Sequence, residues 1–163
     1  MYSSSILRTV SLVAVSLLSS ALASCGKAPP APVTLTSPLA ASVGPLALSA
    51  RLSGTDEVPP VTGSGVGNVA ATINVQNYVL TWTATYSGLT GAASAAHFHG
   101  PAAIGENAAI VVPVTGSLAS PMTGTATLTD AQSADLLAGK WYLNVHTAAH
   151  PNGEIRGQLN VQR

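Results

Sequence analysis

The chain has a single cysteine in 163 residues, and few of its residues are charged (7%) or aromatic (4%). One cysteine excludes an internal disulfide and a cysteine-rich zinc site. Six basic and six acidic residues balance, so no excess of charge favours nucleic acid as a partner. The scarcity of aromatic residues also argues against a surface that stacks bases. The length fits one small domain.

The first 24 residues are typical of an export signal. Arg8 gives a positive start, and Val10–Ala23 is an uncharged apolar run, shorter than the roughly 20 residues that span a membrane. The run ends in Leu22-Ala23-Ser24-Cys25, which resembles the bacterial lipoprotein signal, in which the cysteine becomes the first mature residue and carries lipid. A plain signal peptide, cut after an Ala-x-Ala-like site, is the alternative. We expect residues 1–24 to be removed and Cys25 to be lipidated.

Residues 25–45 predict an extended tether, because five prolines separated by small residues remove hydrogen-bond donors and fix φ. A short edge strand at 33–35 is the alternative for part of it. In bacterial lipoproteins, an Asp directly after the lipidated cysteine is associated with retention in the inner membrane. Gly26 occupies that position here, so we expect anchoring in the bacterial cell envelope at the outer membrane or cell surface. The remaining residues, 46–163, are enough for one sandwich-sized domain.

The domain has the pattern of an all-β fold. In Tyr78–Tyr86 the apolar residues alternate with threonines and one valine, which is the period-two pattern of a strand that buries one side. Gly, Pro, Asn or Ser separates this run from seven similar ones. Eight short strands predict an antiparallel Greek-key sandwich or barrel. The other runs are Leu46–Leu52, Gly65–Asn74, Ala93–His99, Ala109–Val114, Thr123–Thr129, Trp141–His146 and Glu154–Val161.

One short helix is predicted between the sixth and seventh strands. Thr129 is a good N-cap, Gln132 stands three residues later as in a capping box, and Gly139 provides a stop. We expect this helix to close one end of the sandwich.

All four histidines fall in two short segments, His97 and His99 in one, His146 and His150 in the other. Residues two apart on a strand point to the same face, about 6.5–7 Å apart, so His-x-His can hold one divalent ion between two imidazoles. His146 and His150 are expected to supply the third and fourth ligands, which completes a set of imidazoles suited to copper or zinc. The alternative is that these side chains only fasten loops to the sandwich by hydrogen bonds.

Two charged residues stand out in a domain so poor in charge. Glu57, near the end of the first strand, and Arg156, in the last, are expected to form a structural ion pair. No arrangement of residues typical of a catalytic site is found.

Several segments together resemble the CHRD domain, named for the developmental regulator chordin and also found in bacterial secreted proteins. They occur in the order of the family and span residues 48–160. The matching segments are Leu52-Ser53-Gly54, Glu57-Val58-Pro59-Pro60, Ala96-His97-Phe98-His99-Gly100-Pro101-Ala102, Leu136-Leu137-Ala138-Gly139, Trp141-Tyr142-Leu143-Asn144-Val145-His146-Thr147 and Pro151-Asn152-Gly153-Glu154-Ile155-Arg156-Gly157-Gln158-Leu159.

The resemblance implies an immunoglobulin-like β-barrel with limited similarity to copper/zinc superoxide dismutases, and no established activity. His97-x-His99 is similar to the copper-ligand pair of those enzymes, but a bridging histidine, a zinc cluster and the disulfide are missing here. The leading hypothesis is a lipid-anchored envelope module for binding or structure, with a copper or zinc ion at the histidines. A copper-dependent redox enzyme and an adhesion module for a protein or glycan ligand are the alternatives.

Overall fold

The structure, a computed structural model, describes residues 44–163. The predicted signal segment, Cys25 and nearly all of the predicted tether, including the alternative strand at 33–35, lie outside the described residues. Within residues 44–163, no helix is long and apolar enough to cross a membrane.

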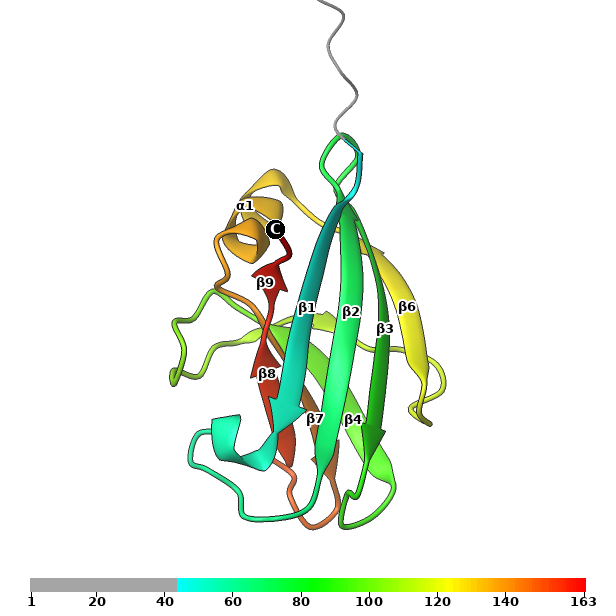
Figure 1. The fold of residues 1–163 in the computed structure, drawn as a ribbon, viewed down its shortest axis with the longest axis vertical. Helices are drawn as coiled ribbons and strands as arrows, with labels where there is room; N and C mark the ends of the chain where they lie inside the picture. Colours follow the sequence, from blue (N-terminus) through cyan, green and yellow to red (C-terminus); the bar gives the residue numbers. More distant parts are fainter. Residues whose placement is uncertain (1–43) are drawn as a thin grey trace, which may run out of the picture. The chain divides into compact units, whose positions relative to one another are not determined.

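The described residues form an antiparallel β-structure with one α-helix (Figure 1). A short 3-10 helix, η1 (Gly54–Asp56), follows the first strand. The strands are β1 (Leu46–Ser53), β2 (Val66–Asn74), β3 (Val79–Ser87), β4 (Ala93–His99), β5 (Ile110–Pro113), β6 (Met122–Thr127), β7 (Tyr142–Thr147), β8 (Ile155–Gln158) and β9 (Asn160–Val161), and the helix is α1 (Asp130–Leu137).

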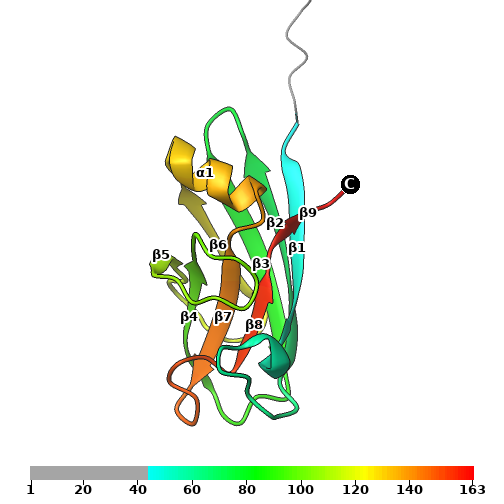
Figure 2. The same ribbon diagram turned by 90° about the vertical axis from the view of Figure 1, so that its left-hand side faces the viewer.

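The strands form one curled sheet in the order β5-β4-β7-β8-β1-β2-β3-β6, with β9 beside β1. Because β5 and β6 end this order without pairing to each other, the sheet is barrel-like with a single seam. Figures 1 and 2 show two facing walls, one with β1, β2, β3 and β6, the other with β4, β7 and β8. The rings of Trp82 on β3 and Phe98 on β4 pack edge to face with centroids 5.0 Å apart, so the core lies between the walls. The prediction of an all-β sandwich or barrel is confirmed.

Strand β3 shows how the alternating sequence builds a wall. Leu80, Trp82 and Ala84 are buried in the core, whereas the threonines between them are exposed. Gly124 lies opposite Trp82 on β6, and a Cβ at Gly124 would overlap the indole ring. The absence of a side chain at Gly124 therefore leaves room for the indole ring of Trp82. Tyr78 precedes the strand with a positive φ of 57°.

The predicted helix is confirmed as α1. The Thr129 side chain accepts from the Gln132 backbone N–H, and the Gln132 side chain accepts from the Thr129 N–H, which completes the capping box. Gly139 has a φ of +71°, the left-handed conformation that ends many helices. In Figure 2 the helix lies at one end of the barrel.

The last predicted strand, Glu154–Val161, is divided into β8 and β9. Strand β8 pairs with β7 along its length and with β1 at Arg156, opposite Ser53, while β9 pairs with β1. Leu159 lies between them, and its N–H donates to the Trp141 carbonyl. The break arises because the C-terminal segment passes from one wall to the other, which no local pattern reveals.

Candidate metal centre

The histidines of β4 and β7 lie on the outer side of their wall. Phe98 is completely buried in the core, so His97 and His99 on either side of it face away from the core. In β7, the apolar Leu143 and Val145 fill the core and alternate with polar residues of the outer side. Those polar residues are Tyr142, Asn144 and His146.

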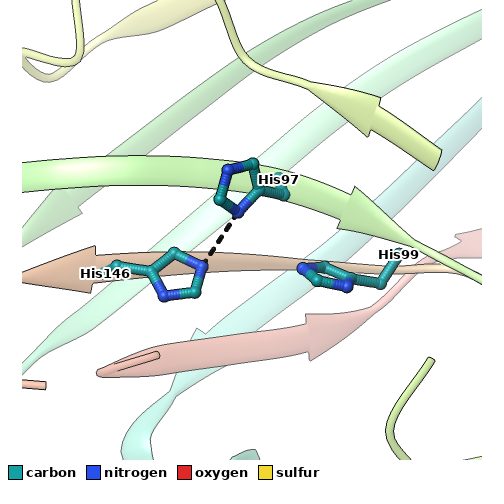
Figure 3. Close-up of side chains that lie close together, drawn as sticks. All are labelled: His97, His99 and His146. Atoms are coloured by element: carbon teal, nitrogen blue, oxygen red, sulfur yellow. Dashed lines mark hydrogen bonds between the residues drawn. The ribbon is translucent and has the colours of Figure 1, made fainter. Parts of the chain in front are cut away.

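The strand register brings three of the four histidines together (Figure 3). One ring nitrogen each of His97, His99 and His146 lies within 4.8 Å of the others. His97 Nδ1 and His146 Nε2 are 3.0 Å apart. His150 is not in this group: its backbone closes a turn with Thr147 after β7 ends.

Backbone carbonyls fix the protonation of two of these rings. His99 Nδ1 lies 2.9 Å from the Ala108 carbonyl oxygen, and His146 Nδ1 lies 3.0 Å from the Pro151 carbonyl oxygen. A carbonyl oxygen only accepts, so both Nδ1 atoms donate, and in the neutral imidazole Nε2 then carries a lone pair. His99 Nε2 is buried without a hydrogen-bond partner among residues 44–163. Imidazoles that bind metal ions have this same arrangement, with the second ring nitrogen tied to a carbonyl or carboxylate.

The surroundings of His97 and His146 favour their neutral forms. Burial lowers the pKa of His97 below its ordinary 6.5, and the charges of His146 and His99 lower it further. Burial also lowers the pKa of His146, and the charge of His99 lowers it further. The hydrogen bond to the Pro151 carbonyl raises this pKa but does not outweigh burial. Neutral imidazole is the form that binds a metal ion.

A stack of side chains supports His99 from β7 and β8. The rings of His99 and Tyr142 are parallel, with centroids 4.8 Å apart and an interplanar angle of 2°. The Arg156 guanidinium lies 3.4 Å from the centroid of the Tyr142 ring. The Tyr142 hydroxyl accepts a hydrogen bond from the Ala108 N–H, and the Ala108 carbonyl accepts one from His99 Nδ1. The segment after β4 is therefore tied to both rings and fixes the His99 side chain.

The family model of the CHRD domain matches residues 48–159, which include all four histidines, Glu57 and Arg156. The chain belongs to the CHRD domain family. No curated protein and no solved structure is significantly similar to it.

In this CHRD domain, Glu57 and Arg156 are both buried but do not form the direct ion pair expected from the sequence. The ion pair within 4.0 Å in the described part of the chain joins Lys140 and Asp135. Arg156 instead donates to the Asn107 side-chain oxygen and to the Glu106 carbonyl. The two charges act only at longer range.

The environment of Glu57 makes its carboxyl unusual. Its side chain is 5% exposed, and Oε1 has no hydrogen-bond partner among residues 44–163. Burial raises the pKa of Glu57 from 4.5 to about 7, although the positive charge of Arg156 opposes this. Both residues line a pocket of about 530 Å³.

Two residues of the candidate metal centre were not singled out from the sequence, Tyr142 and Asn144. They lie in register with His99 and His97 respectively on the neighbouring strand. Their signal in the sequence is the alternation Tyr-x-Asn-x-His in β7, which places three polar side chains on one face. Without knowledge that β7 pairs with β4, that face could not be placed beside His97 and His99.

Proposed function

We propose that the protein is an exported, lipid-anchored CHRD module of the bacterial cell envelope that binds one copper or zinc ion through His97, His99 and His146. The observation that carries the metal site is the group of three ring nitrogens within 4.8 Å. In two of the three rings the opposite nitrogen is bonded to a backbone carbonyl.

The donor set supports a transition metal. Three imidazoles without a carboxylate ligand suit zinc, copper or nickel, whereas calcium and magnesium prefer oxygen. Three histidines from rigid strands, two of them with the second ring nitrogen held, also leave room for a fourth ligand, as four-coordinate sites require.

The anchoring part of the proposal rests on the N-terminal sequence. The apolar run after Arg8 ends at Cys25, the single cysteine of the chain. An anchored domain at the end of a proline-rich tether would act outside the cytoplasm, at the outer membrane or cell surface, with a protein or glycan there as an eventual partner.

The metal part is tested by calorimetry with Cu²⁺ and Zn²⁺ on the full chain, purified in mild detergent without a polyhistidine tag. We expect one ion per chain, with binding lost in His97→Ala and His146→Ala. His150→Ala is the matched control and should bind as the unaltered protein does. Binding weaker than about 0.1 mM (roughly −5.5 kcal/mol), or equal binding by all variants, would show that the histidines only fasten loops.

The anchoring part is tested by growing expressing cells with radioactive palmitate. The unaltered protein should be labelled and sediment with membranes, whereas Cys25→Ala should be unlabelled. An unlabelled, soluble unaltered protein would exclude lipid anchoring without affecting the metal site.

A further inference from the structure

Asn144 lies beside the three histidines. It is 4% exposed and stands opposite His97 in the pairing of β4 with β7. Its side-chain oxygen, Oδ1, is 3.0 Å from His146 Nε2. The same Nε2 is 3.0 Å from His97 Nδ1. Two atoms that could bind a metal ion, Asn144 Oδ1 and His97 Nδ1, therefore approach the lone-pair nitrogen of His146.

These separations match the edges of a metal coordination shell. With bonds of about 2.0–2.1 Å, neighbouring ligand atoms of a tetrahedral site are roughly 3.3 Å apart. His146 Nδ1 already donates to Pro151, so in the neutral ring Nε2 has no proton to give to Asn144 Oδ1. A cation between the two atoms would satisfy both.

Glu57 and Gly153 lie beside the NH₂ end of the Asn144 amide. A Cβ built on Gly153 would lie 2.8 Å from Asn144 Nδ2 and would overlap Glu57 Oε1. The amide NH₂ therefore lies on the side of the glutamate, although Glu57 Oε1 makes no hydrogen bond within the described range 44–163. The amide oxygen lies 3.0 Å from His146 Nε2.

We propose that Asn144 Oδ1 is the fourth ligand of the metal site, and that Glu57 is a positioning residue that holds the Asn144 amide in this orientation. The inference rests on the proposed metal-binding function and completes its ligand set as three nitrogens and one oxygen. It also gives a role to Glu57, which does not form the expected ion pair with Arg156.

The opposite orientation of the amide makes the opposite prediction. If the NH₂ group faced His146, it would donate to Nε2 and compete with the metal for the lone pair. Removing Asn144 would then strengthen metal binding or leave it unchanged. The sign of the effect therefore decides between a ligand and a competitor.

The test compares Asn144→Ala and Asn144→Asp with the unaltered full chain, using calorimetry with Zn²⁺ and the visible absorption of bound Co²⁺. We expect Asn144→Ala to weaken Zn²⁺ binding by about tenfold or more and to change the Co²⁺ spectrum, because a protein oxygen is lost. Asn144→Asp retains an oxygen of nearly the same shape and adds a negative charge, so it should bind at least as tightly as the unaltered protein. Asn68→Ala, an exposed asparagine of β2, is the matched control and should change neither measurement.

Unchanged or tighter binding by a folded Asn144→Ala protein would overturn the proposal. If that variant fails to fold, as judged by circular dichroism, Asn144→Asp decides: weaker Zn²⁺ binding would overturn it. Either result leaves the three-histidine site intact provided that His97→Ala still abolishes binding. Equal binding by His97→Ala and the unaltered protein would instead remove the proposed function itself.

The positioning role of Glu57 has its own readout. Glu57→Gln keeps a side-chain oxygen near the Asn144 NH₂ group and should retain the unaltered Co²⁺ spectrum. Glu57→Ala removes this oxygen and should alter that spectrum and weaken binding. Identical spectra for Glu57→Ala and the unaltered protein would show that the carboxyl does not orient Asn144.

Discussion

His97 and His146 face each other across β4 and β7, with Nδ1 of one 3.0 Å from Nε2 of the other. The two residues are 49 positions apart in the chain. The antiparallel pairing of β4 with β7 is what brings them together. Both rings are on the outer side of the barrel, so a metal ion held between them would not disturb the apolar core.

The pH dependence of metal binding follows from these rings. Burial lowers the pKa of both His97 and His146 below 6.5. Protons therefore compete with the metal only in acid, and Zn²⁺ affinity should be nearly constant from pH 7 to 8 and fall by about tenfold or more toward pH 5. Calorimetry across this range tests it. An affinity that still rises steeply between pH 7 and 8 would indicate a ligand with a higher pKa.

Glu57 should make the metal-free protein less stable as the pH rises. Its pKa is raised from 4.5 to about 7, so the folded state favours the protonated carboxyl. The resulting stabilisation is fully present below pH 4.5 and is lost as the pH rises through 7. The free energy of unfolding should fall by on the order of 3 kcal/mol. Glu57→Gln cannot titrate and should not show this decrease. Urea unfolding with a chelator measures both proteins; a difference between them that is constant with pH would contradict the assignment.

Thr147 should stabilise the domain through the buried Glu154. The Glu154 carboxylate accepts hydrogen bonds from the hydroxyls of Thr147 and Thr90 and from the Thr90 N–H. Burial alone would raise the pKa of Glu154, but these hydrogen bonds outweigh it and lower the pKa below 4.5. Thr147→Val leaves a buried charge with one donor fewer and should cost about 2 kcal/mol.

The effect of Thr147→Val is measured as the change in the free energy of unfolding at pH 7. Thr83→Val, on the exposed face of β3, replaces the same residue type where no buried group depends on it, and should change the stability little. Equal effects of the two substitutions would show that the Thr147 hydroxyl contributes nothing specific.

Gly153 should not tolerate alanine. Its φ is +124°, which L side chains rarely adopt, and a Cβ there would overlap Glu57. The backbone conformation alone should cost roughly 1–3 kcal/mol. Gly63→Ala is the control, because no atom lies within 4 Å of the place that its methyl group would occupy. Thermal unfolding should show a lower midpoint for Gly153→Ala only; similar midpoints for both variants would disprove the close approach.

Local patterns in the sequence predicted much of the fold. The alternation in Tyr78–Tyr86 and the capping box at Thr129 depend on neighbours within a few residues, and both are present in the structure. The placement of His97 and His99 on one face, away from the core, follows in the same way from Phe98 between them. A strand has a period of two and a helix cap spans four residues, so the amino-acid order alone determines these features.

The partners of these side chains depend on the tertiary structure. Register places His146 and Asn144 beside His97, while the turn after β7 carries His150 elsewhere. Arg156 bonds to the segment after β4 rather than to Glu57. Such contacts join segments tens of residues apart, and their geometry is set by strand order and by the loops that cover the wall. The sequence therefore determined which residues face outward, and only the packing of distant segments decided which of them meet.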